Sequence, residues 1–533
     1  IFKNAIFTQN YKRNKRQKFE DSKNELDDDD DAEKQVISEE ELSTSDSNNS
    51  SNEEEKDNEL YPKKPKEKKK KRLSTMHLLK MRKEEVTHFR RIHKIYVSGN
   101  DVPDPIENFN QLVSDYGVSS LMLGNIHKLG YAAPTPIQMQ ALPLLLHFIF
   151  YSIIFNGFSI MIHNLKGPEK GGVRAVIIAP TRELVKQIYS FCVQLAESTN
   201  LRTLIIEDVN SAKKKPKFLK KHDILISTPN RLIYMLQEDP PVISLHRVQW
   251  LIVDECDKLF EVGKQGFRDQ LAIIYKACDS ADVKRAMFSA TFSHDVEEWC
   301  KMTFDSLVSV SIGTKNTAVS TIKQELLFVG CEGGKLLALR NLINEGFMPP
   351  VMIFVQSKER AQELYSELVF ENIRIDVIHS DLPQEKRDNV VKNFIDGKIW
   401  VLICTELMGR GIDFKGVNLV INYDFPPTAI SYIHRIGRTG RAGEEGRAVT
   451  YFTTDDIENL RSIAQVMKNA GCQVPDYIMK LKKGPKKNKS EPVRPIKRQK
   501  ISTVPKYEIQ KESKKRKLIQ DSIKKKFKKH ASS

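Results

Sequence analysis

The feature that most constrains the fold is an apolar run that ends abruptly in acidic residues: Val248–Val253, then Asp254, Glu255 and Asp257 around Cys256. A run without polar alternation predicts a strand buried on both faces, which is typical of a parallel sheet covered by helices. Functional residues of open α/β sheets lie at the carboxyl ends of the strands, where these carboxylates are. The run therefore predicts an α/β fold with acidic side chains at the functional edge of its sheet.

Two interpretations of these carboxylates stay open on this segment alone. Asp254 suits a hydrated Mg²⁺ ion, and Glu255 suits a base that polarises a water molecule against a γ-phosphate. Acidic residues are also common in the first turn of a helix, because its N-terminus carries partial positive charge. The rest of the chain decides between a nucleotide-hydrolysing site and a simple helix start.

Strands and helices alternate through most of the chain, as in doubly wound parallel sheets. Small and polar residues at Gly313–Ser320 interrupt the alternation and predict a linker between two α/β lobes, 101–313 and 314–480, with a cleft between them. Strands are predicted at Val173–Pro180, Leu201–Glu207, His222–Ser227, Val248–Glu255 and Lys284–Ser289, and in the second lobe at Gln324–Val329, Val351–Gln356, Arg374–His379, Trp400–Cys404, Val417–Tyr423 and Ala448–Phe452. Helices are predicted at Glu183–Glu197, Phe267–Cys278, Lys335–Asn344, Glu359–Glu371, Gln384–Phe394 and Asp456–Ala470.

The two ends of the chain have a composition that predicts disordered tails, residues 1–100 and 481–533. The first has an acidic run at Asp27–Asp31 and a basic block at Lys63–Arg72, and such sequences bury too little apolar surface to offset chain entropy. From Lys482 on, 20 Lys and Arg stand against 4 Asp and Glu, a surplus equal to the +16 of the whole chain. The two charge runs of residues 1–100 are either solvated tethers or signals for nuclear import and nucleic-acid contact, and the basic C-terminal tail is predicted to add nonspecific RNA affinity.

Cysteine usage and the lack of a recognisable leader predict an intracellular protein. The 7 cysteines include no Cys-x-x-Cys pair, and an odd number without metal-ligand spacing is expected for reduced thiols. No signal peptide is visible, and the chain begins at Ile1 rather than Met, so we expect its true start to lie upstream. A basic helix is predicted at Thr75–Ile95.

Several short motifs near the predicted strands suit nucleotide or phosphate ligands. In Tyr131–Gln138, the Gln138 amide can pair with the N6/N7 edge of adenine, although a solvent-facing Gln in a Pro-rich helix entry is the simpler explanation. Two other motifs each follow a strand and open a helix, so they offer either phosphate-backbone cradles or ordinary helix caps. Their candidate residues are Pro180, Thr181 and Arg182, and Thr228, Pro229 and Arg231.

The segment Tyr432–Arg441 is the most specific of these motifs. Arg435, Arg438 and Arg441 alternate with glycines around a helix end, an arrangement that suits fork-like contacts to phosphate oxygens. Ser289-Ala290-Thr291, by contrast, carries little information by itself.

Together these motifs resemble the DEAD-box family of ATP-dependent RNA helicases, over about Phe109–Ala470. Asp254–Asp257 stands at the motif that names the family, with Cys256 in place of the usual Ala. The resemblance implies two tandem RecA-like lobes, each a parallel sheet covered by helices, with ATP and Mg²⁺ as cofactors. It also implies binding of RNA across both lobes through its backbone, with little sequence preference.

The resemblance assigns roles to individual residues. Catalysis falls to Glu255, Asp254, Arg438 and Arg441, and Asp254 binds the metal through water. The remaining assignments are Phe109, Gln138, Gly411 and Asp413 for the nucleotide; Asp257, Ser289, Thr291 and His434 for coupling between the lobes; and Pro180, Thr181, Arg182, Thr228, Pro229, Arg231, Gln356 and Thr405 for RNA. Val209–Lys213 lies where the family usually has a Gly-Gly pair, which puts one RNA contact in doubt.

Further segments are similar to the Rok-type helicases of small-subunit ribosome assembly, namely Phe267–Leu271, Arg285–Ser289 and Trp400–Asp413. This similarity implies pre-rRNA and pre-ribosomal particle proteins as partners, and the nucleus and nucleolus as location. We expect a monomer that does not span a membrane. A DNA helicase with similar lobes fits the motif set less well.

One part of the family pattern is missing. A phosphate-binding loop, Gly-x-x-x-x-Gly-Lys-[Ser/Thr], should follow Leu145, and the sequence contains none. In its place stands the apolar run His147–Asn156, which with flanking residues approaches the length of a membrane span, an interpretation that motifs on both sides disfavour. We interpret the gap as an incomplete gene sequence. A non-catalytic RNA-binding scaffold with the helicase fold is the alternative.

Overall fold

The fold is described from a computed structural model of the chain. The chain divides into two units, Asn10–Phe89 and a larger unit of Ile1–Gln9 with Arg90–Ser533, which contains both predicted lobes. The predicted acidic and basic runs of the N-terminal tail and the apolar run from Phe148 to Asn156 lie outside the described residues. The described residues are 4–8, 75–147, 172–199, 201–214, 219, 221–260, 267–280, 283–291, 294–304, 307–314, 321–406, 414, 416–441, 444–480, 496–503 and scattered positions between 511 and 522.

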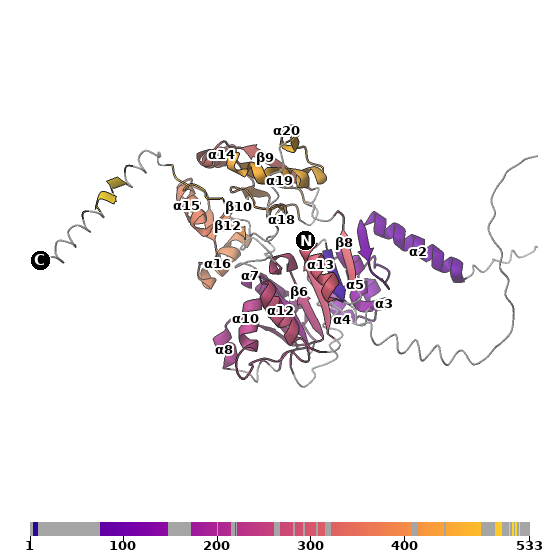
Figure 1. Cartoon of the computed structure of the whole chain (residues 1–533). Helices are drawn as coiled ribbons and strands as arrows, with labels where there is room; N and C mark the ends of the chain where they lie inside the picture. Colours follow the sequence, from indigo (N-terminus) through magenta and orange to yellow (C-terminus); the bar gives the residue numbers. More distant parts are fainter. Residues whose placement is uncertain are drawn as a thin grey trace, which may run out of the picture. The chain divides into compact units, whose positions relative to one another are not determined.

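The first lobe is built on an 8-stranded sheet in the order β2-β8-β1-β7-β6-β3-β5-β4. Five neighbouring strands, from β7 to β4, are parallel, as the apolar runs predicted. Strand β6 is buried at each of its positions, since helices cover the sheet (Figure 1). The strands are β1 (Asn4–Thr8), β2 (Ile95–Ser98), β3 (Ala175–Ile178), β4 (Thr203–Ile205), β5 (Ile224–Ser227), β6 (Trp250–Val253), β7 (Lys284–Ser289) and β8 (Leu307–Ile312).

Strand β1 differs from its neighbours in direction and origin. It lies between β7 and β8 and is antiparallel to both, so β7 and β8 run in the same direction with β1 reversed between them. Ala5, Ile6 and Phe7 are almost fully buried, and Phe7 contacts Phe288 of β7 edge to face. Residues 1–100 were predicted as a disordered tail, and β1 and β2 correct this, because both belong to the sheet of the first lobe.

The helices of the first lobe begin where capping residues follow the strands. Thr181 caps α7 by accepting a hydrogen bond from the Leu184 backbone N–H at 3.3 Å, and Pro229 opens α10. The helices are α3 (Asn110–Ser114), α4 (Ser120–Lys128), α5 (Pro136–His147), α7 (Arg182–Leu195), α8 (Val209–Lys213), α10 (Pro229–Leu236), α11 (Cys256–Leu259), α12 (Arg268–Ala277) and α13 (His294–Thr303). Helix α2 (Thr75–Ile92) confirms the predicted basic helix.

The second lobe is a 6-stranded sheet in the order β11-β12-β10-β13-β14-β9, and its described pairings are parallel. Separate hydrophobic clusters form its core. Its strands are β9 (Ile322–Phe328), β10 (Val351–Val355), β11 (Ile375–Ile378), β12 (Val401–Thr405), β13 (Leu419–Asn422) and β14 (Gly446–Phe452). Its helices are α14 (Glu332–Glu345), α15 (Lys358–Leu368), α16 (Gln384–Ile395), α18 (Ala429–Ile436), α19 (Ile457–Asn469) and α20 (Asp476–Lys480).

The C-terminal tail departs from prediction at one segment. Residues 496–503 pack on the second lobe, where Ile501 is 7% exposed and joins a hydrophobic cluster. The predicted disorder of residues 481–533 is therefore wrong for residues 496–503, because the buried side chains of Arg498 and Ile501 attach this segment to the lobe.

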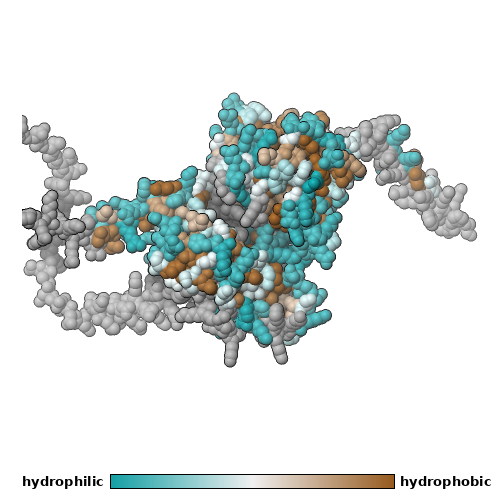
Figure 2. Space-filling model, turned by 180° about the vertical axis from the view of Figure 1, so that it is seen from behind, coloured by the Kyte–Doolittle hydropathy of each residue, from teal (hydrophilic) through white to brown (hydrophobic). Residues whose placement is uncertain are grey.

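The surface and the helices agree with a protein whose apolar residues are mostly internal. On the face shown in Figure 2, hydrophilic residues surround smaller hydrophobic patches. Among the described residues, no helix combines the length and apolar character needed to cross a bilayer.

Candidate functional site

The acidic residues lie together at the carboxyl end of β6. Glu255 has φ +48° and ψ 47°, a left-handed conformation that costs a non-glycine residue about 1–3 kcal/mol. The turn allows the Asp254 carboxylate to accept a hydrogen bond from the Glu255 backbone N–H at 2.7 Å. Cys256 is fully buried, as expected for a small residue in the place of alanine. Strain of this kind is typical of functional sites, and here it gathers three carboxylates within four residues.

Two carboxylate oxygens of this cluster are left without a hydrogen-bond partner among the described residues. They are Asp254 Oδ2 and Glu255 Oε2, and both are buried. Burial, and next the charge of Glu255, raise the pKa of the Asp254 carboxyl well above its usual value. Since a buried carboxylate without a counter-charge is costly, the donor set fits a divalent cation such as Mg²⁺ at Asp254.

A hydrogen-bonded relay joins Asp257 of the first lobe to the second lobe. Ser289 Oγ donates to Asp257 Oδ1 at 2.6 Å, and Thr291 Oγ1 lies 3.3 Å from Asp257 Oδ2. His434 Nε2 lies 2.8 Å from Asp257 Oδ2 and 3.0 Å from Thr291 Oγ1. His434 Nδ1 is also 3.7 Å from Glu255 Oε2. The structure thus brings the four predicted coupling residues together in a fully buried cluster.

The arginine motif continues from His434 along α18 and the turn after it. Arg438 Nε donates to the His434 carbonyl at 3.1 Å, and Arg441 Nε donates to the Gly437 carbonyl at 2.9 Å. Arg435 points elsewhere, donating to the Asp424 carbonyl at 2.8 Å. His434 therefore contacts Arg438 directly, and Arg441 follows in the turn after α18; both arginines are predicted contacts of the γ-phosphate.

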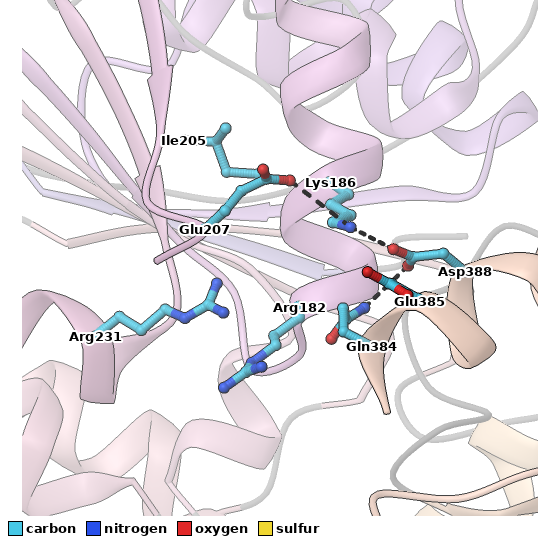
Figure 3. A pocket seen from close by; sticks show the side chains of 8 residues that line it. All are labelled: Arg182, Lys186, Ile205, Glu207, Arg231, Gln384, Glu385 and Asp388. Atoms are coloured by element: carbon cyan, nitrogen blue, oxygen red, sulfur yellow. Dashed lines mark hydrogen bonds and ion pairs between the residues drawn. The ribbon is translucent and has the colours of Figure 1, made fainter. Parts of the chain in front are cut away.

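Basic residues from the first lobe meet α16 of the second lobe around a cavity of about 180 Å³. Figure 3 shows Arg182 and Arg231 reaching toward the same space from α7 and α10. Burial, and then the charge of Arg182, lower the pKa of the Arg231 guanidinium. Two arginines held near each other suit an anionic ligand such as an RNA phosphate.

The other predicted phosphate contacts act here as parts of helix starts. Thr181 forms the side-chain cap described above, so the simpler interpretation of its hydroxyl holds. Thr228 is the N-cap residue of α10 and makes no side-chain cap bond, while Pro180 and Pro229 flank these starts. The backbone N–H groups at both helix ends remain compatible with a phosphate ligand.

The predicted nucleotide contacts are only partly within the described residues. Gln138 is 6% exposed, and its Oε1 accepts a hydrogen bond from the Thr135 backbone N–H at 2.7 Å, so it is not solvent-facing. Phe109 is 1% exposed in the protein core at the start of α3. Gly411 and Asp413 lie outside the described residues.

Two predicted RNA contacts lie at the ends of neighbouring strands of the second lobe. Thr405 ends β12 and is in register with Val355, and Gln356 follows Val355 directly. At the position expected for a Gly-Gly pair, Val209–Lys213 forms the helix α8, which Asp208 caps.

Some contacts between the lobes were not predicted from the sequence. Lys186 Nζ lies 2.5 Å from Asp388 Oδ2, and Gln384 Nε2 donates to Glu183 Oε1 at 3.1 Å. Arg387 Nη1 is 3.4 Å from the same Glu183 oxygen. These are polar positions on amphipathic helices, and no sequence signal separates them from ordinary solvent-facing residues.

Comparisons with known proteins agree with this geometry. The DEAD/DEAH box helicase family matches residues 155–299, and the helicase conserved C-terminal domain matches residues 334–443. The probable ATP-dependent RNA helicase DDX52 of Bos taurus is 54% identical over 466 residues, which is 85% of this chain and 78% of the relative. The ATP-dependent RNA helicase ROK1 of Kluyveromyces lactis is 38% identical over 466 residues, 84% of this chain and 80% of the relative.

Solved structures are similar as well. S. cerevisiae Dbp5 bound to RNA and ADP BeF3 has a TM-score of 0.59 at 25% identity, covering 69% of this chain and 98% of that one. The DEAD-box helicase Mss116 bound to ssRNA and UDP-BeF has a TM-score of 0.60 at 25% identity, covering 71% and 82%. With its two parallel-sheet lobes and the acidic site at β6, the chain belongs to the DEAD-box family of ATP-dependent RNA helicases, hydrolases that act on ATP, and is close to the DDX52 and ROK1 type.

Proposed function

We propose that the protein uses ATP to separate short RNA duplexes in precursor ribosomal RNA during assembly of the small ribosomal subunit. The observation that carries the proposal is the relay from Asp257 through Ser289 and Thr291 to His434. It links the carboxylates of one lobe to the arginine helix of the other, so closure of the lobes and chemistry at Glu255 depend on each other. The similarity to DDX52 and ROK1, both ATP-dependent RNA helicases, supports RNA as the target, and the resemblance to Rok-type helicases implies ribosomal RNA.

Within this proposal each lobe supplies its own part of the site. Asp254 would hold Mg²⁺ through water, and the ion would neutralise charge on the phosphates. Glu255 orients the attacking water, while Arg438 and Arg441 approach the γ-phosphate when the lobes close. Arg182 and Arg231 bind RNA phosphates, with pre-ribosomal particle proteins as further partners in the nucleus and nucleolus.

A strand-displacement assay tests this function. A chain in which a phosphate-binding loop follows Leu145 should displace a labelled strand from a short duplex when ATP is present, and long duplexes should resist, because closure bends RNA only locally. Binding of the duplex without displacement, under any nucleotide condition, would instead favour the second candidate, an RNA-binding scaffold. That candidate is supported by the missing loop in the sequence.

The basic C-terminal tail, Lys482–Lys529, gives a further prediction. We expect it to add nonspecific RNA affinity and to direct the protein to the nucleolus, because of its surplus of Lys and Arg. Deleting residues 504–533 removes part of this charge and spares the packed segment 496–503. The slope of log affinity against log salt should flatten by roughly one unit or less for each RNA phosphate that the tail no longer neutralises. An unchanged slope together with unchanged nucleolar location would contradict the prediction, and deletion of the acidic run Asp27–Asp31 is the control.

A further inference from the structure

The segment 496–503 runs along α15 from its beginning to its end. Arg360 Nη1 donates to the Gln499 carbonyl at 2.7 Å near the start of the helix. Further along, the Ile501 backbone N–H donates to Glu363 Oε2 at 3.0 Å, and the Thr503 N–H donates to Glu367 Oε1 at 3.2 Å. The segment is therefore bound in one register, and not merely adjacent to the lobe.

Arg498 anchors the segment in an acidic socket of the second lobe. Its side chain is 2% exposed, with Nη1 2.8 Å from Glu332 Oε1 and Nη2 2.7 Å from Asp456 Oδ1. Its Nε lies 3.6 Å from Asp424 Oδ1. Glu332, Asp424 and Asp456 belong to the folded lobe, so the socket holds its three carboxylates whether or not Arg498 is present.

Among the described residues, the charges of the socket balance when Arg498 is in place. Lys335 and Arg360 are the other cations in contact with Glu332 and Asp424 in this part of the chain, and two positive charges leave one of the three carboxylates uncompensated. Burial alone would raise the pKa of Asp424, but the bonds from Arg360 and the nearby cations lower it to about 2. Because an unpaired buried charge is strongly unfavourable, Arg498 is held firmly.

Arg498 also fixes the side chain of Gln356. Its Nε donates to Gln356 Oε1 at 2.9 Å, and Gln356 Nε2 donates to the Ile496 carbonyl at 2.9 Å. The Gln356 backbone N–H is tied to Asp424 at 2.9 Å. A primary amide has two N–H donors, so these bonds set which way the second donor points.

We propose that Arg498 is a positioning residue for RNA binding, which orients the Gln356 amide so that its second N–H donates to a phosphate oxygen of the RNA backbone. The inference rests on the proposed function and on the expectation from the sequence that Gln356, which directly follows β10, contacts RNA. It extends the RNA-binding apparatus of the second lobe to a segment far along the chain from the helicase motifs.

Affinity for a fluorescent single-stranded RNA, measured by anisotropy on the full chain, tests this role. Arg498→Ala and Gln356→Ala should each weaken binding by roughly ten- to a hundredfold, the value of one hydrogen bond to a charged group. The double variant, Arg498→Ala with Gln356→Ala, should have about the same RNA affinity as the single variant with the lower affinity, because both changes remove one shared interaction with RNA. Lys500→Ala, an exposed cation in the same segment, is the charge-matched control, and its small effect should add to that of Gln356→Ala.

If Arg498→Ala unfolds the second lobe, Arg498→Lys provides a second test of the same role. A lysine keeps the charge in the socket but lacks the planar fork that reaches Glu332, Asp456 and Gln356 together. We expect its thermal unfolding to stay near that of the unchanged chain, with RNA affinity reduced as in Gln356→Ala.

Unchanged RNA affinity in Arg498→Lys would overturn the inference, and so would effects of the two alanine changes that add in the double variant. Tighter RNA binding by Arg498→Ala would also overturn it, because it would show that the segment competes with RNA. If the unchanged chain binds no RNA, the proposed function itself fails. The attachment of the segment by Arg498 is then tested by hydrogen exchange. Arg498→Ala should speed the exchange of the Ile501 and Thr503 backbone amides, and Lys500→Ala should not.

Discussion

Replacing Glu255 by Gln is expected to lower ATP turnover by about 10²-fold or more in a chain that carries a phosphate-binding loop. Glutamine has the same shape but cannot accept the proton of the attacking water. Glu255 Oε2 makes no hydrogen bond among the described residues and lies 3.7 Å from His434 Nδ1, so the fold loses little stability. Steady-state turnover, with ATP and RNA binding measured in parallel, checks the expectation.

Binding of ATP and RNA should survive the change, because Glu255 acts only in the chemical step. Glu197→Gln is the matched control, since that side chain lies on the surface of the same lobe at 59% exposure. Full turnover in Glu255→Gln would end the assignment of this residue as the base. Loss of ATP binding would show that it holds the nucleotide instead.

Deleting residues 1–9 is expected to destabilise the first lobe of the chain as written. Ile6 and Phe7 of β1 are 2% and 3% exposed, and burial of each such side chain contributes about 1.5–3 kcal/mol. The strand also pairs with β7 and β8 along its length, and the deletion would leave those strands without their shared partner. Chemical denaturation should show a decrease of several kcal/mol in the free energy of unfolding, a large share of the roughly 5–15 kcal/mol of a typical domain.

The same deletion tests where the strand before a phosphate-binding loop would lie. A phosphate-binding loop follows a strand and precedes a helix, and β7 and β8 run in the same direction with β1 reversed between them. We infer that a restored strand would take this position, so that residues 1–9 become dispensable for stability once the loop is present. A deletion that costs the same stability in both chains would contradict this, and removal of residues 40–60 is the control for shortening the tail.

The elements that the sequence predicted well are those whose signal is local. Strands such as β6 are short apolar runs because helices cover both faces of a parallel sheet, and the predicted bounds agree with the structure within a few residues. The start of helix α11 directly after Glu255 agrees with the helix start that the carboxylates allowed, whereas its left-handed turn was not predicted. Helix α7 begins after Thr181, and because Thr is a preferred N-cap residue, this helix start can also be predicted from the sequence.

What the sequence could not show depends on partners that are distant along the chain. Strand β1 has its partners at β7 and β8, and its five residues are too few to stand out in a tail of charged composition. Arg498 is one of many cations until Glu332, Asp424 and Asp456 are seen around it. The contact between Lys186 and Asp388 forms only where the two lobes meet, and the hydrophobic periodicity of a sequence does not predict how lobes meet.

The most direct test of the account is ATP turnover with and without single-stranded RNA, in the chain as written and in one with a phosphate-binding loop after Leu145. The chain as written should show no turnover, because Asp254 and the arginines cannot replace the backbone cradle, the lysine and the hydroxyl that such a loop supplies. The restored chain should hydrolyse ATP, and RNA should accelerate it, since His434 of one lobe is bonded to Asp257 of the other. Equal turnover of the restored chain with and without RNA, or turnover by the chain as written, would contradict the account.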